Sequence, residues 1–228
     1  MKRILMRAGM SPLSNLSPLE VLTENTIGSN IGNMLFPYSI SRTLTTEDTK
    51  IDTIRIGKGI TDEDADRINR TYDCMVLPFA NAFRGSFKQE LRIMIRLMKK
   101  IKIPCVVVGV GAQASLDDTI KDSELDMLVR RFVKLILKRS AMLGLRGEFT
   151  ADYLKRLGFQ AERDFTVIGC PSMFMWGDQL PEMKLQELTP DSRVSMNSKI
   201  SLSGPFHKMM ERSRKQFADY TYVPQVIE

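Results

Sequence analysis

Apolar runs alternate with helical patterns through the middle of the chain. Four short runs of apolar and β-branched residues predict buried strands at Cys74–Leu77, Cys105–Val110, Ala141–Leu145 and Phe165–Ile168. Between them, apolar residues recur at helical spacing and predict helices over 84–102, 123–139 and 148–157. Strand–helix–strand repetition with nearly continuous apolar strands predicts a Rossmann-like α/β fold, in which a parallel sheet carries helices on both faces.

The segments on either side of this core are less regular. Upstream, an Asn/Gly-rich loop leads into a helix, and Pro37 predicts that this helix starts no earlier than about Asn33, because proline is tolerated only in the first turn. Residues 174–198 contain two prolines and show no clear period, which predicts a connection. After it, the pattern predicts a strand, a helix and a strand, at Lys199–Leu202, around His207–Phe217 and at Tyr220–Val223.

These patterns predict three parts: an N-terminal lobe over 1–175, a connecting segment over 176–198, and the start of a truncated C-terminal lobe over 199–228. A single strand–helix–strand unit is too small to form an independent core. It is therefore expected either to pack on the first lobe or to open a second lobe that is incomplete.

Composition narrows the class of protein. With 43% hydrophobic and 26% charged residues in 228, the chain is not wholly disordered, and no apolar run approaches the ~20 residues that span a bilayer. The basic N-terminus lacks the continuous apolar core of a secretory signal. Three cysteines form no Cys-x-x-Cys pair, and the single histidine gives them no zinc partner at ligand spacing. We therefore expect a reduced, cytoplasmic setting and no metal site.

The net charge of +6 is concentrated in one segment. Residues 84–102 contain seven basic residues and one acidic residue, and their pattern predicts an amphipathic helix. One interpretation is a solvated outer face; the other is a surface that contacts anionic lipid or an acidic polymer. No aromatic residues interleave with the basic ones in a nucleic-acid-binding pattern, which argues against nucleic acid as a partner.

Candidate ligand-binding residues follow the predicted strands, because parallel sheets bind ligands beyond the carboxyl ends of their strands. Asn81 and Arg84 follow the first of the four strands, and Gly111 and Gln113 follow the second. Asn81 can donate and accept hydrogen bonds, and Arg84 can hold an anion. The alternative is that Asn81 caps the next helix, Arg84 is solvated, and the glycine segment is a plain turn. The match of the glycine segment to a dinucleotide fingerprint is too weak to predict a nicotinamide site.

Arg146 is the best candidate for an anion site. It follows the third strand directly before a helix, where free N–H groups and the helix dipole favour an anion and a guanidinium adds bidentate binding. The alternative is a surface ion pair with Glu148 or Asp152. After the fourth strand, Ser172 can donate to an anion, whereas Cys170 is predicted to be a packed core thiol because no basic partner is visible nearby.

The loop before Pro37 offers a second cradle for an anion or a sugar. It contains Asn30, Gly32 and Asn33 and leads into a helix N-terminus. The alternative is simple capping of that helix by Asn33.

Taken in order, these segments resemble the polysaccharide pyruvyl transferase family. Its Gly-x-Asn-x-Gly-Asn/Asp loop is matched by Gly28-Ser-Asn30-Ile-Gly32-Asn33, and its glycine-rich strand-end loop by Gly109-Val-Gly111-Ala-Gln113. Its Arg-Asp/Gly-x-x-Ser/Thr motif is matched by Arg146-Gly-Glu-Phe-Thr150. The Gly169-Cys-Pro-Ser172 turn follows at the family's spacing. The resemblance covers roughly residues 25–175, and residues 199–225 resemble the family more weakly.

The resemblance implies a two-lobed, glycosyltransferase-B-like architecture and transfer of pyruvate from phosphoenolpyruvate to a sugar of a cell-surface polysaccharide, forming a ketal. It implies that Arg146 anchors the donor, that Thr150 and Ser172 belong to the binding site, and that His207, the only histidine, is the general acid. No cofactor is implied beyond this donor substrate. The acceptor would be a glycan or a lipid-linked saccharide, reached from the inner membrane face through the basic helix 84–102.

Two alternatives remain open at the level of sequence. His207 could be a structural or merely exposed histidine. The whole chain could be a truncated, catalytically inactive relative that binds a sugar or an anion without turnover. The oligomeric state is also left open by the sequence.

Overall fold

The computed structural model describes residues 1–24, 30, 32–114, 122–180, 182, 184–198 and 204–224. The chain divides into two compact units. The first contains Met1–Asn15 and Leu35–Asp178, and the second contains Leu16–Met34 and Gln179–Glu228.

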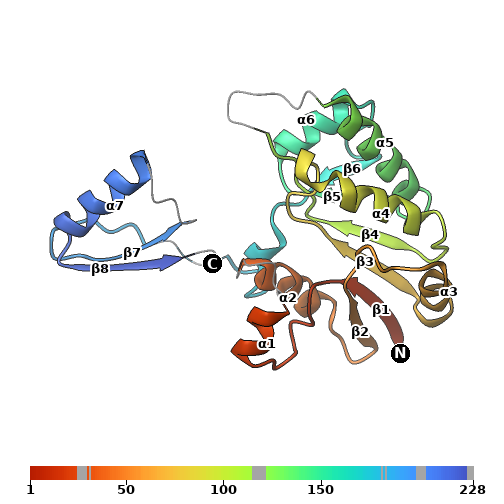
Figure 1. Ribbon diagram of the computed structural model, residues 1–228, viewed down its shortest axis with the longest axis horizontal. Coiled ribbons are helices and arrows are strands. Elements are labelled where there is room, and N and C mark those ends of the chain that lie inside the picture. Colours follow the sequence, from red (N-terminus) through yellow and green to blue (C-terminus); the bar gives the residue numbers. More distant parts are fainter. Residues whose placement is uncertain are drawn as a thin grey trace. The chain divides into compact units, whose positions relative to one another are not determined.

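The first unit is built around a parallel sheet with the strand order β2-β1-β3-β4 (Figure 1). These strands are β1 (Lys2–Arg7), β2 (Thr49–Ile54), β3 (Cys74–Pro78) and β4 (Cys105–Val108). Two further parallel strands, β5 (Leu143–Leu145) and β6 (Phe165–Val167), pair with each other. A parallel bridge joins Val110, just after β4, to Leu145. The strand ends that follow β3, β4, β5 and β6 therefore open toward the same edge.

Helices flank both faces of this sheet, as the sequence pattern predicts. The helices and 3₁₀ turns are α2 (Gly32–Leu44), α3 (Asp62–Thr71), η1 (Gly85–Phe87), α4 (Lys88–Met98), α5 (Ser123–Leu137), α6 (Glu148–Arg156) and η2 (Pro171–Phe174). Side chains alternate along a strand, so Met75 and Leu77 of β3 join the large core cluster, whereas Val76 packs with Phe36 and Ile40 of α2 on the opposite face.

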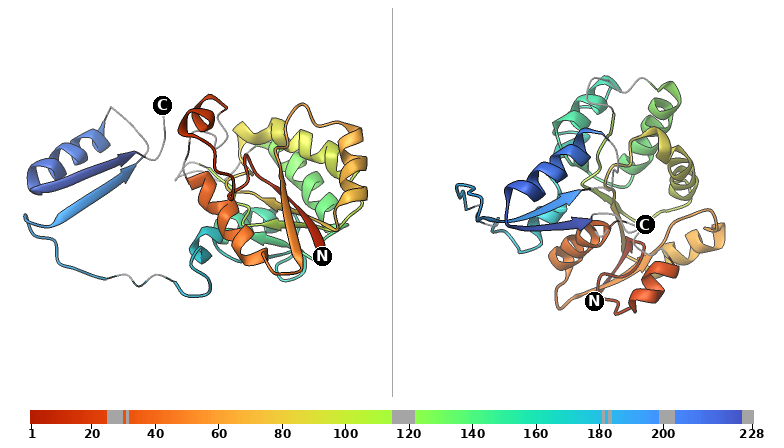
Figure 2. Two further views of the ribbon diagram at one scale, coloured as in Figure 1. Left: turned by 90° about the horizontal axis from the view of Figure 1, so that it is seen from below. Right: turned by 60° about the vertical axis from the view of Figure 1, so that its left-hand side comes forward.

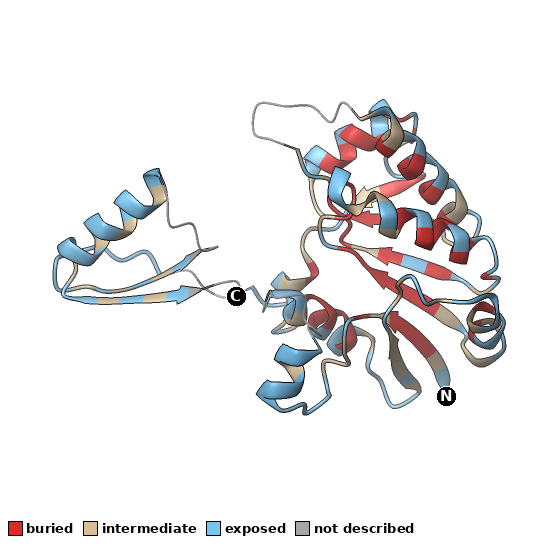
Figure 3. Cartoon of the chain, viewed as in Figure 1, coloured by how far each residue is buried: buried red, intermediate tan, exposed pale blue. Residues whose placement is uncertain are grey.

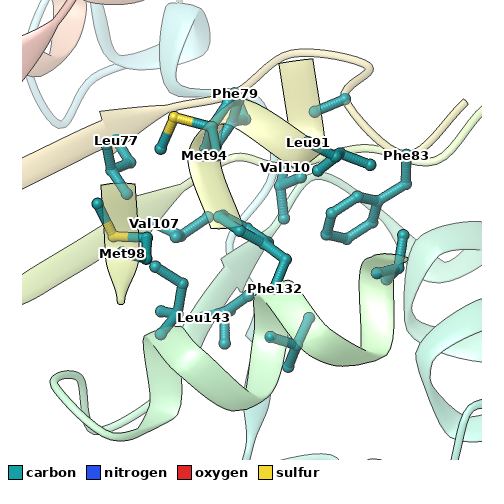
Figure 4. Close-up of a cluster of buried hydrophobic side chains, with 14 of the residues drawn as sticks. Leu77, Phe79, Phe83, Leu91, Met94, Met98, Val107, Val110, Phe132 and Leu143 are labelled. Carbon is teal, nitrogen blue, oxygen red and sulfur yellow. The ribbon is translucent and has the colours of Figure 1, made fainter. Parts of the chain in front are cut away.

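The large cluster fills the space between the sheet and the α4–α5 pair. In Figure 3, the buried residues, drawn in red, lie on the strands and on the inward faces of these helices. Figure 4 shows Phe132 of α5 among the labelled side chains of this cluster. Its ring meets the rings of Phe79 and Phe83 edge to face, with centroids 5.7 and 6.3 Å away. Phe79 and Phe83 belong to the loop after β3, so the core holds the base of that loop in place.

Two parts of this unit differ from the sequence prediction. Strands β1 and β2 and helix α3 were not predicted. Helix α2 begins at Gly32, and Pro37 lies in its second turn, so the prediction that the proline stands in the first turn is wrong. A proline at this position removes only the N–H that would bond the carbonyl of Asn33. Burial of Phe36, Pro37 and Ile40 against the sheet stabilises the helix despite that loss.

Helix α6 carries Thr150 and is attached to α5 through side-chain hydrogen bonds to Asp126. The hydroxyl of Tyr153 donates to Asp126 Oδ1 at 2.9 Å, and the guanidinium of Arg156 donates to both carboxylate oxygens at 3.0 and 3.1 Å. Burial and the Asp126 carboxylate raise the pKa of Tyr153, which keeps its hydroxyl protonated. This attachment fixes the helix that begins next to Arg146.

We expect Tyr153→Phe to lower the free energy of unfolding by about 1 kcal/mol, because one hydrogen bond is lost while Arg156 still satisfies both oxygens of Asp126. Denaturant unfolding of both proteins measures the difference. Tyr38→Phe is the control, since Tyr38 is exposed on α2. An equal loss in the two variants would show that the Tyr153–Asp126 bond contributes nothing.

On the α2 face, the sheet borders an apolar cavity of about 680 Å³. Val106 and Val108 of β4 line it together with Ile40, Ile168 and Phe174. Val106 lies in β4, the last strand of the four-strand order, and is 41% exposed. This part of the α2 face is therefore covered less completely than the α4–α5 face.

The second unit contains a strand–helix–strand arrangement. Strand β7 (Arg193–Ser198) and strand β8 (Asp219–Pro224) pair in parallel, joined through α7 (Pro205–Gln216), as Figures 1 and 2 show. The helix and the last strand agree with the predicted elements. The first strand lies at 193–198, inside the stretch predicted to be a connection, while Lys199–Leu202 lies outside the described residues. The unit also contains α1 (Pro18–Thr23), which a Ser17–Glu20 capping box begins.

Candidate functional site

The loops that follow β3, β4, β5 and β6 meet at the carboxyl ends of the strands. Phe83 N–H donates to the Gly111 carbonyl at 3.0 Å, and Gly111 N–H donates to the Ala80 carbonyl at 2.6 Å. Arg146 N–H donates to the Val110 carbonyl at 2.9 Å. We call the resulting group the strand-end site; it comprises Asn81, Arg84, Gly111, Gln113, Arg146, Thr150, Cys170 and Ser172. Seven of these eight residues were predicted from the sequence to bind ligand.

Arg146 lies at the centre of the strand-end site. Its backbone directly follows β5, and its partly buried side chain reaches two other loops. Nη1 donates to Asn81 Oδ1 at 2.9 Å, and Nη2 donates to Cys170 Sγ at 3.3 Å. The ring of Phe36 lies 6.0 Å from the guanidinium carbon. The guanidinium is thus held at a fixed place above the strand ends.

The alternative in which Arg146 forms a surface ion pair is wrong. Within the described ranges Arg146 forms no ion pair, and Asp152 is bonded to Lys155 at 3.0 Å instead. A guanidinium that is held only by neutral groups has no carboxylate partner to displace before it binds an anionic ligand.

Asn81 connects two guanidinium groups. Arg84 Nη1 donates to the backbone oxygen of Asn81 at 2.7 Å, whereas Arg146 donates to its side-chain oxygen. Asn81 Nδ2 is 3.4 Å from Gln113 Oε1, so the side chain binds across the site and does not cap the next helix. Arg84 Nε also donates to Ser86 Oγ at 2.9 Å. Two cations therefore share one anchoring residue.

Gly111 permits this close approach. A Cβ atom on Gly111 would lie 3.1 Å from Asn81 Oδ1, 3.1 Å from the Ala80 carbonyl and 3.4 Å from Arg146 Cδ. A larger residue would push against the atoms that hold Arg146. Thr150 is buried, and its hydroxyl oxygen accepts from Ala112 N–H at 2.9 Å, which fixes the same loop from the side of α6. Gln113 is exposed at the end of that loop.

Cys170 is a member of the site that sequence reasoning missed. The prediction that no basic partner lies nearby is wrong, because Arg146 contacts its sulfur. Burial opposes ionisation of the thiol, but hydrogen bonds from Ser172 and the charge of Arg146 together lower the pKa of Cys170. Arg146 follows β5 and Cys170 follows β6, and these two strands pair in parallel. The order of the strands therefore brings the two loops to one edge of the sheet, but it does not by itself predict the contact between the two side chains.

Arg7 is a second residue that the sequence did not reveal, because β1 was not predicted. It ends β1, and its Nη1 donates to the carbonyl of Pro78 at 3.2 Å. Its guanidinium lies 4.8 Å from the ring of Phe79 and 5.9 Å from that of Phe87, and Arg84 lies 5.5 Å from the same Phe87 ring. Burial lowers the pKa of Arg7, while the charge of Glu90 acts in the opposite direction.

Four predicted site residues belong to the second unit. Asn30 Oδ1 accepts from Gly32 N–H at 2.9 Å, and Asn33 N–H donates to the Asn30 carbonyl at 2.9 Å, so Asn30 bonds to the first two residues of α2. Gly28 of the same motif lies outside the described residues. His207 lies in the first turn of α7, and its side chain is exposed.

The basic segment 84–102 is only partly free to meet an anionic surface. Lys88 pairs with Asp122 at 2.8 Å and with Glu124 at 3.0 Å, Arg92 pairs with Glu124, and Lys100 pairs with Asp62 at 3.2 Å. The apolar residues of α4 are buried in the core. Contact through this segment would therefore depend on charge and not on insertion of an apolar face.

The fold and the site define an α/β protein with a cationic site at the carboxyl ends of parallel strands. The family model of polysaccharide pyruvyl transferase matches residues 30–224, so the chain belongs to the polysaccharide pyruvyl transferase family. This confirms the resemblance in the sequence motifs and supports a role in pyruvyl transfer on polysaccharides. No curated protein and no solved structure matches the chain. None of the helices in the described ranges has both the length and the apolar character needed to cross a membrane.

Proposed function

We propose that the protein transfers pyruvate from phosphoenolpyruvate to a sugar of a cell-surface polysaccharide, forming a cyclic ketal. The observation that carries the proposal is the pair of guanidinium groups of Arg146 and Arg84, both attached to Asn81. Neither forms an ion pair with any residue that the structure describes. Phosphoenolpyruvate carries a carboxylate and a phosphate, and two neighbouring guanidiniums suit a ligand with two anionic groups.

The chemistry requires a proton and stabilisation of negative charge. A general acid protonates the methylene carbon of phosphoenolpyruvate, and a sugar hydroxyl adds to the oxocarbenium carbon C2 and loses its proton. The C2–O bond to phosphate then breaks, and a second sugar hydroxyl attacks C2 to close the ketal ring. The reaction consumes one donor and one diol and releases one phosphate. Arg146 and Arg84 would stabilise the charge on the donor carboxylate and the departing phosphate.

His207, the single histidine, is the proposed general acid. An imidazole is a common general acid, which suits proton transfer to carbon in this reaction. The acceptor would be a glycan or a lipid-linked saccharide. For a lipid-linked acceptor, segment 84–102 would add contact with an anionic membrane surface. The net positive charge of the segment supports this contact, although some of its basic residues already form ion pairs.

The test is transfer itself. The purified full chain is incubated with phosphoenolpyruvate and a panel of purified glycans that present neighbouring hydroxyls. Phosphate release is followed together with the product mass. We expect phosphate release that depends on one class of glycan and a product heavier by one pyruvate less one water. Donor hydrolysis without any change in glycan mass would contradict the proposal.

A second candidate is a relative that binds a sugar or an anion without turnover. The observation that favours it is that no residue of α7 is buried, so packing does not hold His207 in one position. This candidate predicts a thermal shift with phosphoenolpyruvate but no phosphate release with any glycan.

A further inference from the structure

The guanidinium of Arg146 is held from two sides by loops that come from different strands. Asn81, after β3, accepts from Nη1, and Cys170, after β6, accepts from Nη2. One N–H on each terminal nitrogen is occupied in this way. A guanidinium has five N–H groups, so three remain for a ligand, and their direction is set by the two contacts.

The sulfur of Cys170 is itself held in place. It shares a hydrogen bond of 2.9 Å with Ser172 Oγ. The next residue, Pro171, is buried and begins η2. Its ring packs so closely on the loop after β4 that a Cβ atom on Gly109 would lie 2.5 Å from Pro171 Cδ. The sulfur is thus placed by backbone packing and not by a freely moving side chain.

The three cysteines of the chain differ in their electrostatic surroundings. Burial raises the pKa of Cys105 to about 12, and burial with the nearby Asp73 raises that of Cys74. For Cys170, the contributions of Ser172 and Arg146 exceed the effect of burial, so its pKa is lowered. Arg146 is the charged group that contacts the sulfur in the described part of the chain. Cys170 is therefore the most easily ionised of the three thiols.

We propose that Cys170 is a positioning residue: its sulfur, together with Asn81 Oδ1, orients the guanidinium of Arg146 so that the remaining N–H groups face the anionic donor. This role rests on the proposed function, because the donor is phosphoenolpyruvate. Cys170 acts through Arg146 and takes no part in bond making. Its loss leaves Arg146 held on one side only, which weakens donor binding without removing the cation.

One experiment tests the contact without any ligand. The full chain is labelled with iodoacetamide at pH 7, and the rate at each cysteine is read by peptide mass spectrometry. We expect Cys170 to react first in the wild type, because the thiolate is the reactive form. In Arg146→Gln the rate at Cys170 should fall by up to about tenfold, the factor that corresponds to a lost charge-assisted hydrogen bond of roughly 1.4 kcal/mol. Equal rates in the two proteins would overturn the contact.

A second experiment tests the role in donor binding. Dissociation constants for phosphoenolpyruvate are measured by calorimetry, and KM and kcat by phosphate release. We expect Cys170→Ala to raise the dissociation constant and KM about tenfold at little change in kcat, because one hydrogen bond to a charged group is lost. Cys170→Ser should recover most of the affinity, since a hydroxyl oxygen also accepts from Nη2. Cys74→Ala is the control and should bind as the wild type.

The two possible failures can be told apart. A wild-type chain that does not bind phosphoenolpyruvate would overturn the proposed function, and the donor-positioning role would fall with it. Binding by the wild type with unchanged affinity in a folded Cys170→Ala variant would overturn the positioning role alone. The melting temperatures of the variants identify any that are simply unfolded.

Discussion

Replacing Arg146 by alanine is expected to reduce acceptor-dependent phosphate release from phosphoenolpyruvate by about 100-fold or more in kcat/KM, the usual result of removing one preorganised charge donor from an active site. The reason is the place of this guanidinium. It lies at the carboxyl ends of parallel strands, is held by Asn81 and Cys170, and forms no ion pair within the described ranges. Initial-rate kinetics with the purified variant measure the loss.

Two further variants show whether charge or geometry matters at position 146. Arg146→Lys keeps the charge but cannot bond Asn81 and a ligand as a planar fork, so it should recover only part of the rate. Arg131→Ala removes an exposed cation from α5 and should leave the rate unchanged. A fully active Arg146→Ala protein would contradict the assignment of Arg146 as the donor anchor.

Replacing Gly109 by alanine is expected to lower the free energy of unfolding by about 3 kcal/mol, the sum of a left-handed backbone penalty and steric overlap. Gly109 has φ +66°, which L side chains rarely adopt. An added Cβ would also lie 2.5 Å from the ring of Pro171 and 2.8 Å from that of Phe36, neither of which has room to move freely. Denaturant unfolding measures the change.

Gly158→Ala separates the two contributions. Gly158 also has a left-handed conformation, with φ +89°, but nothing lies within 4 Å of an added Cβ. Its substitution should cost about 1 kcal/mol from backbone strain alone. Equal losses in the Gly109 and Gly158 variants would show that the contact between Gly109 and Pro171 is not tight.

The sequence predicted the part of the fold in which apolar runs are longest. Strands β3, β4, β5 and β6 and helices α4, α5 and α6 agree with the predicted elements within a few residues. Strand β1 was not predicted because its apolar run is only three residues long, Ile4, Leu5 and Met6. Basic residues lie on both sides of this run, which is typical of an exposed, charged terminus. Strand β2 is an edge strand whose residues are only partly buried, so it lacks a continuous apolar run.

The residues of the candidate site that directly follow a predicted strand could be predicted from the sequence. Asn81, Gly111 and Arg146 were singled out because each follows a strand, and parallel packing brings those ends together. Pairwise contacts were not predictable. The contact between Arg146 and Cys170 depends on the turn at Gly169, whose φ of +81° redirects the chain after β6. No spacing in the sequence reports that change of direction.

Asn81 also determines how far apart two positive charges stand. Its backbone oxygen accepts a hydrogen bond from Arg84, and its side-chain oxygen accepts one from Arg146. The distance between the two guanidiniums therefore depends on the length of this amide side chain. A glutamine at this position would shift Arg146 and leave Arg84 where it is. For a dianionic donor held between the two groups, we expect the change in separation to favour a molecule of different length, so position 81 would influence the size of the donor.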